Sequence, residues 1–279
     1  MKATLIPAEA TAGSFTTVSL ELTIEGETIR QGGYLKVAPF RRVANYWAPA
    51  QGRMRERKNY VTLNTAADAG LCLTIEGGWD ALVRVETGRL AHGDTVTIAY
   101  GDTSGGGPGF QLSSLAGKAE LRISYAPDAE TEEEEIAQVF FYLRPGEPAE
   151  LRARLRKEPG RQAALLRPVL IDRFGNTAEN SPAGLKVESI EGVEYEGQNA
   201  FPKGGKALCA GVITAKAPLP CSRIRVSAPS LGLAALSDPV SMDTQVFWGD
   251  LHCHTRLAQA LDTPEFLYEY AKNDAALDF

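Results

Sequence analysis

Alternating apolar and polar side chains are the dominant pattern along this chain. The segment 18–25 interleaves four apolar residues with four polar ones, Val18, Leu20, Leu22 and Ile24 against Ser19, Glu21, Thr23 and Glu25. A period of two is typical of a β-strand that has one face in the core and one in water. The alternation returns in 71–75, 96–100 and 119–125, and turns rich in Gly and Asp separate these segments. Short strands separated by turns predict an antiparallel β-sandwich.

The first sandwich is expected to end at a cluster of proline and glycine in 144–148, because such clusters end strands and mark linkers between domains. Further short apolar runs follow at 151–155, 170–171, 185–187, 208–214 and 224–226. About seven strands of this kind indicate an immunoglobulin-like module. The turn 172–176 has the sequence DRFGN and resembles the D-x-x-G-N turn of bacterial immunoglobulin-like repeats. We therefore expect β-sandwich domains over 1–145 and 146–243.

The pattern changes in the last segment of the chain. A short apolar run around 245–248 predicts a strand, and Thr263-Pro264-Glu265 then has the residues that begin a helix: an N-cap, a proline in the first position and an acid in the first turn. Apolar residues follow at helical spacing, and Leu277 to Phe279 predicts the start of another strand. The expected fold class is mainly β, two immunoglobulin-like antiparallel sandwiches followed by a first βα unit over 244–279.

Composition limits the classes of partner. The chain has 29 Lys and Arg against 35 Asp and Glu, a net charge of -6, which argues against a nucleic-acid partner. No apolar stretch approaches the roughly 18 residues that span a membrane, and the N-terminus lacks the apolar segment of a secretory signal. The four cysteines form no CxxC pair, so we expect reduced thiols, with a Cys209–Cys221 bridge as the alternative. These features predict a soluble, cytoplasmic protein.

A candidate metal site lies at the end of the expected strand. His252 and His254 flank Cys253, and alternate residues of a strand share a face, so both imidazoles would project to one side about 6.6 to 6.8 Å apart. They could hold one metal ion or two neighbouring ones. Asp250 lies on the same face and could ligate directly or orient an imidazole. Cys253 would face the core. Taken alone, an HxH tripeptide is more often structural or incidental.

The surroundings of this tripeptide carry a resemblance. WGDLHCHT, followed by TPEFLYEYAKNDAALDF, resembles the opening motif of the PHP superfamily, the metal-dependent hydrolases of the polymerase and histidinol phosphatase type. More narrowly, a β-rich region before FWGDLHCHT, with the glycine-rich YGDTSGGGPGFQ, is similar to a bacterial family of PHP-like proteins. The match covers the 33 residues from Phe247 to Phe279 and departs from the pattern at Ala258 and Gln259.

This resemblance implies a distorted (β/α) barrel holding two or three divalent metal ions, Zn, Mn or Fe, whose first ligands match His252 and His254. Metal-activated water would attack a small anionic ester, a phosphoester above all. A barrel needs about 250 residues, so the resemblance predicts a catalytically incomplete N-terminal fragment of a hydrolase. The fragment is expected to bind the metal weakly or not at all, and its C-terminal segment could self-associate.

Three further features have two interpretations each. The glycine-rich segment 101–109 lacks a Gly-Lys-Ser/Thr ending and predicts a connecting loop, or a loop offering backbone N–H groups to the substrate. The one basic concentration lies near Tyr46 and Trp47 and consists of Arg41, Arg42, Arg53, Arg55, Arg57 and Lys58. It is a solvated face, or it attracts an anionic substrate or an acidic partner. The acidic run within 130–135 is expected in a loop, as a possible partner of that cluster.

Two functions remain open at this point. The first is the N-terminal part of a PHP-like hydrolase, with Asp250, His252 and His254 as metal ligands. The alternative is a stand-alone β-sandwich module that binds a glycan or a protein, with the HxH pair incidental. The third histidine, His92, lies in an Ala-His-Gly-Asp turn, so no arrangement of Ser, His and Asp predicts a nucleophilic triad.

Overall fold

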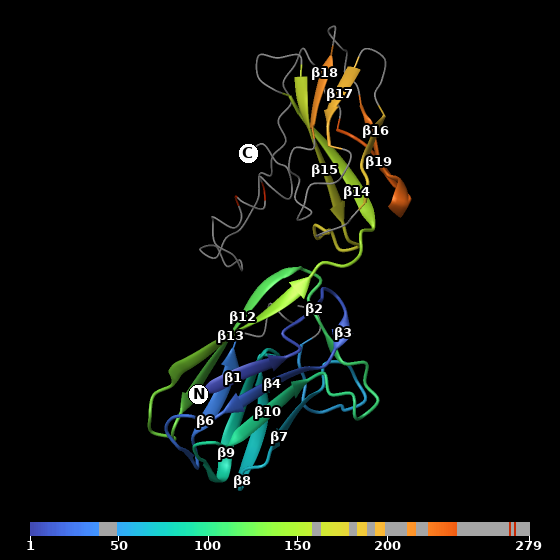
Figure 1. Cartoon of the computed structure of the whole chain (residues 1–279). Coiled ribbons are helices and arrows are strands. Elements are labelled where there is room, and N and C mark those ends of the chain that lie inside the picture. Colours follow the sequence, from blue (N-terminus) through green and yellow to red (C-terminus); the bar gives the residue numbers. More distant parts are fainter. Residues whose placement is uncertain are drawn as a thin grey trace. The chain divides into compact units, whose positions relative to one another are not determined.

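The computed structural model describes residues 1–38, 49–157, 163–178, 183–188, 193–198, 211–215 and 223–238, together with Tyr268 and Ala271. The chain divides into two compact units, Met1–Arg144 and Pro145–Phe279, called unit 1 and unit 2 below (Figure 1). Strands β1 to β20 make up nearly all the regular structure of the described residues, with a short 3-10 helix at Pro229–Leu231. The prediction that the chain is mainly β is confirmed.

Unit 1 contains a four-stranded antiparallel sheet of order β1-β4-β10-β7. Its strands are β1 (Lys2–Ile6), β4 (Val18–Thr23), β10 (Thr95–Tyr100) and β7 (Val61–Thr65). The central strand β4 places Leu20 opposite Leu5 of β1 and opposite Ile98 of β10. Leu20 and Leu22 are fully buried, so the alternation in the sequence separates a core face from an outer face, as predicted.

A larger sheet of unit 1 has the order β2-β13-β12-β6-β9-β5, and β8 pairs with β9. Its strands are β2 (Glu9–Thr11), β13 (Glu134–Arg144), β12 (Gly117–Ala126), β6 (Tyr34–Ala38), β9 (Asp80–Leu90), β5 (Ile29–Arg30) and β8 (Ala69–Glu76). Only β2 and β13 run parallel among these described strands. A separate two-stranded ladder joins β3 (Phe15–Thr16) to β11 (Phe110–Gln111).

The two large sheets of unit 1 enclose one hydrophobic core. Both contribute fully buried side chains, among them Leu20, Leu22 and Ile98 from the small sheet and Leu35, Val83, Leu121, Ile123 and Phe141 from the large one. Burying each such side chain contributes about 1.5 to 3 kcal/mol. Tyr100 meets Phe110 edge to face at 5.8 Å between ring centroids, and burial raises the pKa of its phenol far above the usual value. Unit 1 is therefore a sandwich of two sheets.

Unit 2 also contains two sheets. One sheet has the order β14-β15-β18-β17 and the other β16-β19-β20. The strands are β14 (Glu150–Lys157), β15 (Ala163–Ile171), β18 (Gly211–Ala215), β17 (Val193–Gly197), β16 (Lys186–Glu188), β19 (Arg225–Ala228) and β20 (Leu233–Leu236). Leu166, Ile213 and Val226, from both sheets, are buried in one core.

The DRFGN turn of unit 2 is organised by the buried carboxyl of Asp172. Its Oδ1 accepts hydrogen bonds from the backbone N–H groups of Phe174 (2.8 Å) and Asn176 (2.9 Å). Its Oδ2 accepts from the backbone N–H of Gly146 and from Asn176 Nδ2, both at 2.9 Å. Burial raises the pKa of Asp172, but these hydrogen bonds outweigh it and hold the pKa below its usual value. The turn thus fixes the Gly146 end of the proline and glycine cluster.

The last expected element cannot be compared with the structure. The βα unit over 244–279 lies outside the described residues, apart from Tyr268 and Ala271. Within the part of the chain that the structure describes, no helix is both long and apolar enough to cross a membrane.

Candidate binding loop

The predicted metal ligands Asp250, His252 and His254 lie outside the described residues, so this site stays a prediction. In the described part of the chain, no group of three or more His, Cys, Asp and Glu side chains could hold a metal ion. Of the four cysteines, Cys72 is described and has a free thiol, while the two that form the alternative disulfide lie outside the described ranges.

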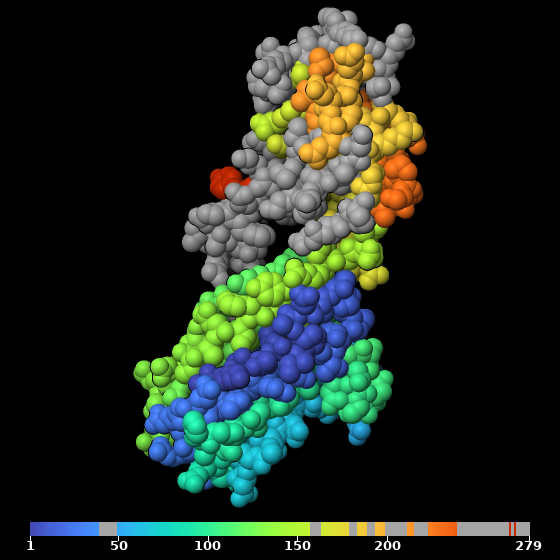
Figure 2. All heavy atoms as spheres, in the orientation of Figure 1, coloured from blue at the N-terminus to red at the C-terminus, as the bar shows by residue number. Residues whose placement is uncertain are grey.

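The structure brings together two features that the sequence presents separately, the basic segment 53–58 and the glycine-rich segment 101–109. A Cβ atom on Gly105 would lie 2.5 Å from the carbonyl oxygen of Arg55, and one on Gly107 would lie 2.8 Å from that of Arg57. Only glycine allows the two backbones to approach this closely. In Figure 2 the glycine-rich segment stands out as a green bulge at the right of unit 1.

Asn59 anchors the basic segment to the sandwich. It is 1% exposed and adopts a left-handed backbone with φ of 62°, a conformation that asparagine tolerates better than most residues. Its backbone N–H donates to Gly109 O at 2.9 Å, and its Oδ1 accepts from the backbone N–H of Gln111 at 2.7 Å. Its Nδ2 donates to Pro49 O at 3.3 Å. Through its backbone and its side chain, Asn59 therefore joins Pro49, which precedes the basic segment, to Gly109 and Gln111 at the end of the glycine-rich loop.

Gln51 closes the basic segment from the other end. Its Oε1 accepts from the backbone N–H groups of Arg53 (2.9 Å) and Met54 (2.8 Å). Its Nε2 donates to the carbonyl oxygens of Met54 (2.8 Å) and Lys58 (3.3 Å). The Lys58 ammonium donates to Gln111 Oε1 at 2.8 Å. The side-chain amide of Gln51 thus bonds both ends of the segment and holds its backbone in a closed loop.

Asp102 fixes the start of the glycine-rich loop. Its Oδ1 accepts from the backbone N–H of Ser104 at 2.7 Å, and its Oδ2 accepts from the Thr62 hydroxyl at 2.8 Å. These hydrogen bonds, that from Ser104 above all, lower the pKa of Asp102, and the positive charge of Arg55 lowers it further. The carboxylate stays ionised at neutral pH and keeps the loop in place.

The cations of the segment are presented to solvent on this fixed backbone. Arg53, Arg55 and Arg57 are exposed, and in the described part of the chain none of their guanidinium groups takes part in a hydrogen bond or ion pair. With Lys58 and one acid, Glu56, segment 53–58 has four cations and a net charge of +3. The sequence-predicted cluster is therefore confirmed as an exposed face over these residues, while Arg41, Arg42, Tyr46 and Trp47 lie outside the described ranges.

The acidic run does not serve as the partner of this basic segment. Glu133 accepts a hydrogen bond from the Ser124 hydroxyl at 2.6 Å and one from the Tyr34 hydroxyl at 3.1 Å, and it lies 3.7 Å from the Lys36 ammonium. The hydrogen bond from Ser124 is the main cause that lowers the pKa of Glu133. Ser124 belongs to β12, and Tyr34 and Lys36 belong to β6, so the partners of Glu133 lie on the large sheet.

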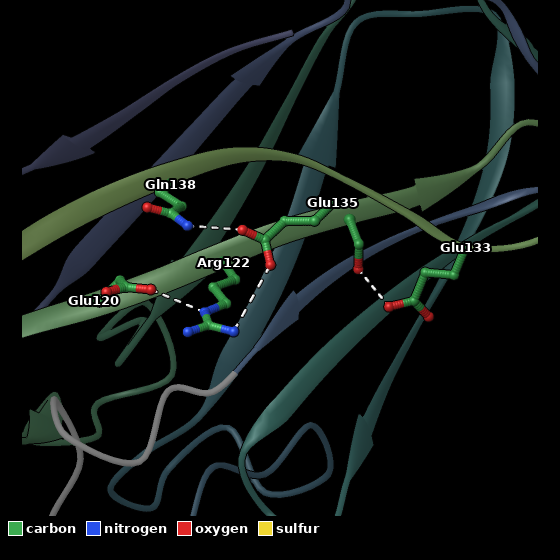
Figure 3. A network of polar contacts seen from close by, with 6 residues as sticks. Glu120, Arg122, Glu133, Glu135 and Gln138 are labelled. Carbon is green, nitrogen blue, oxygen red and sulfur yellow. Dashed lines mark hydrogen bonds and ion pairs between the residues drawn. The ribbon is translucent and has the colours of Figure 1, made fainter. Parts of the chain in front are cut away.

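Figure 3 shows the polar contacts of Glu133 and Glu135, two residues of the acidic run. Arg122 of β12 donates to Glu120 at 2.8 Å and lies 3.9 Å from Glu135, which accepts from Gln138 at 2.7 Å. Glu135 is part of β13, so the expectation that the whole run lies in a loop is wrong for its last two residues. The contact between Arg122 and Glu135 joins two strands, and the sequence does not reveal such cross-strand neighbours.

Sequence reasoning missed an aromatic pair on the outer face of β13. Phe140 and Tyr142 are 37% and 39% exposed, and Lys118 Nζ lies 3.6 Å from the centroid of the Phe140 ring. The signal was present as the run Phe140-Phe141-Tyr142, in which Phe141 is fully buried and its neighbours must face outward. Lys118 lies over the Phe140 ring and the Arg144 guanidinium lies 5.7 Å from the centroid of the Tyr142 ring, which leaves the basic segment as the stronger candidate site.

Comparison with known proteins shows no family. No protein-family model and no curated protein matches the chain. Two solved structures that match are domains 4–9 of surface layer protein SbsC, at 10% identity and a TM-score of 0.24, and the Escherichia coli adhesin FdeC, at 15% and 0.27. The alignments cover 85% and 81% of this chain but only 31% and 57% of those two, so the chain spans less than two thirds of either.

These findings correct the assignment to the PHP superfamily and, with it, the description of the chain as a phosphoesterase. No family model supports it, and the matching structures are a surface layer protein and an adhesin. The assignment depended on 33 residues at the end of the chain, with departures at Ala258 and Gln259. A motif that short fixes neither the fold nor the chemistry of the β-rich residues before it.

Proposed function

We propose that this chain is a binding module of two immunoglobulin-like β-sandwich units, without a catalytic role, and that unit 1 binds an acidic protein segment. The ligand contacts the basic segment 53–58, here called the basic loop. The observation that carries the proposal is the presence of three exposed guanidinium groups, without a partner among the described residues, on a backbone that Gln51 and Asn59 fix. The histidine pair of the C-terminal segment takes no part in this binding.

A fixed cationic loop suits recognition of carboxylates for two physical reasons. Each guanidinium is a planar fork that can donate two parallel hydrogen bonds to one carboxylate. Because the backbone of the loop is already ordered, binding avoids much of the entropy cost of ordering it. The chain as a whole carries a charge of -6, so the local charge of +3 also directs an acidic partner to this one place.

The side chains of the basic loop favour a protein ligand over an acidic glycan. Met54 is 42% exposed between Arg53 and Arg55, and arginine, methionine and aromatic residues are the types enriched at protein interfaces. Segment 53–58 contains no aromatic side chain on which the face of a sugar ring could stack. An extended peptide rich in Glu and Asp, with an apolar side chain against Met54, has the matching chemistry.

Binding of poly-L-glutamate tests the proposal. The test variant replaces Arg53, Arg55 and Arg57 together with Gln, which removes the charges and keeps polar side chains. Three exposed ion pairs contribute about 0.2 to 1 kcal/mol each, so the affinity is expected to fall about 10-fold. The titration is run at ionic strengths of about 10 mM and about 150 mM, and the difference between the variants should shrink at the higher value because salt screens exposed charges.

A matched variant separates a specific site from net charge. Lys2, Arg89 and Arg223 are exposed, lie away from the basic loop in the sequence, and their replacement with Gln gives the same change in net charge. The proposal expects this control to keep most of the affinity. Equal losses in both triple variants would show that overall charge alone explains the binding. Heparin binding to the loop more tightly than poly-L-glutamate does would contradict the choice of a protein ligand.

A further inference from the structure

Strand β8 is one of the two longest sheet edges in the described part of unit 1, the other being residues 134–141 of β13, which β2 leaves uncovered. Strand β8 has eight residues and pairs with β9 alone (Figure 1). The other strands that end the two large sheets are β1 and β7 with five residues each, β2 with three and β5 with two. Natural sheets keep their edges short or protect them, since an unpaired edge is a template for another strand.

Hydrogen bonds on the far side of β9 show which groups of β8 face outward. The Val85 N–H donates to Gly33 O, and Val85 O accepts from the Gly32 N–H, both at 2.9 Å, so the backbone of Val85 faces the β6 side. Leu71 of β8 lies opposite Val85. In an antiparallel ladder, a residue opposite one that faces away is itself turned away. The N–H and C=O of Leu71 therefore point to the free edge.

The same alternation places Leu73 and Ile75 in the outward-facing set. They lie opposite Val83 and Ala81, two and four residues from Val85 along β9. Apart from the ladder with β9, none of the described residues pairs with Leu71, Leu73 or Ile75 through its backbone. Three N–H groups and three C=O groups thus form an open row.

The side chains of β8 lack the usual protection of an edge. Residues 69–75 contain no charged side chain and no proline, the residues that normally guard an edge strand, although the β8–β9 ladder has a register shift between Gly70 and Leu71. Leu71, Leu73 and Ile75 pack against the core but are only half buried. The edge offers hydrogen bonds together with apolar surface, which is the chemistry of strand addition.

We propose that the partner of this edge is a second copy of the chain, joined by an antiparallel β8–β8 ladder across a two-fold axis at Leu73. In this register Leu73 meets Leu73 of the second copy and Leu71 meets Ile75, so three facing pairs exchange six N–H···O hydrogen bonds. On the outer face Cys72 lies opposite Thr74 of the second copy, and Glu76 lies opposite Gly70 of the second copy. No charge faces another, and the edge is complementary to itself as a two-fold interface requires.

A shift of the register by two residues is less favourable. It would place Cys72 opposite Cys72 of the second copy and Glu76 opposite Asp68, two like charges that destabilise a cross-strand pair. Ala69 could not replace the lost facing pair, since its N–H already donates to Ala67 O at 2.9 Å. The ladder would then have four hydrogen bonds, so the register centred on Leu73 is the one expected.

Oxidative cross-linking of the full chain tests both the dimer and its register. The variant Thr74→Cys, which keeps Cys72, places two thiols in a facing pair without hydrogen bonds, where Cα atoms lie about 4.5 Å apart and a disulfide forms readily. We expect a disulfide-linked dimer in which peptide mapping finds Cys72 of one copy bridged to the introduced thiol of the other. In the wild type the two Cys72 residues are diagonal neighbours about 7 to 8 Å apart, too far for a bridge. Cys72–Cys72 linkage in the wild type would overturn the register.

Sedimentation equilibrium measures the same dimer without cross-linking. The wild-type mass should rise with concentration from that of one chain toward that of two. Leu73→Pro removes an outward N–H that β9 does not use, and Thr74→Lys adds the charge that protects natural edges; each should weaken dimerisation about 10-fold or more. Circular dichroism checks that both variants fold. A monomeric wild type, or a dimer that both folded variants leave unchanged, would overturn the proposal.

Discussion

The substitution Asn59→Ala should be among the most damaging in unit 1, although it removes only a few atoms. Asn59 is 1% exposed, and its Oδ1 is the acceptor for the Gln111 N–H at 2.7 Å. Alanine leaves that N–H without its acceptor. The alanine residue must also adopt the backbone conformation with φ of 62°, which costs alanine more free energy than it costs asparagine.

The two losses can be separated by a second substitution. A hydrogen bond lost from a partly buried donor costs about 1 to 2 kcal/mol, and the left-handed backbone costs alanine about 1 kcal/mol. Asn59→Ala should therefore lower the free energy of unfolding by about 2 to 3 kcal/mol. Asn59→Gly loses the hydrogen bond, but glycine adopts the left-handed backbone without strain. Its free energy of unfolding should therefore be about 1 kcal/mol higher than that of the alanine variant.

Urea denaturation of the full chain measures these changes, and hydrogen exchange of 101–111 locates them. Asn64 on the edge strand β7 is exposed, and its replacement with alanine should change stability by less than about 0.5 kcal/mol. If Asn59→Ala behaves like Asn64→Ala, the side chain of Asn59 does not hold the two loops together. Equal stabilities of Asn59→Ala and Asn59→Gly would refute the backbone part of the reasoning alone.

Three other predictions concern the turn, the loop and the metal. Asp172→Ala should lower the stability of unit 2 by about 1 to 3 kcal/mol at pH 7. Because the pKa of Asp172 is lowered on folding, its contribution is present above its unfolded value and is lost as pH falls through the folded value, so wild type and variant should converge in acid denaturation. Gly105→Ala should weaken poly-L-glutamate binding, whereas Gly52→Ala, with open space around its Cβ, should not. Calorimetric zinc titration should show weak binding, at about micromolar affinity or worse, that the double variant His252→Ala/His254→Ala abolishes; identical titrations would exclude these ligands.

The strands of unit 1 could be predicted because their signal is local. In β4 the apolar residues at every second position point to one side by geometry, and Leu20 and Leu22 are fully buried as the pattern requires. The order of strands in a sheet has no such signal. Residues 71–75 are correctly expected as a strand, but its position at an edge depends on which strands pair with β9.

The basic loop could be predicted as a concentration of charge but not as a site. Its contact with the glycine-rich segment is made by the backbone carbonyl oxygens of Arg55 and Arg57, and the sequence does not indicate which backbone atoms make such contacts. The importance of Asn59 arises from its buried hydrogen bonds and its backbone angle, and neither follows from a single asparagine between a lysine and a tyrosine. Contacts between residues some 50 positions apart are set by the sandwich as a whole.

The clustering of unpaired cations on an ordered backbone is the strongest argument that the basic loop has a ligand. Arg122, Arg144 and Lys36 of unit 1 each lie within 4.0 Å of a carboxylate, as expected in a chain with more acids than bases. Arg53, Arg55 and Arg57 take part in no ion pair among the described residues, although the charge of Arg55 acts on Asp102, and the side chain of Gln51 orders the backbone between them. Ordering like charges side by side is unfavourable for the free protein and becomes favourable when a carboxylate-rich partner neutralises them.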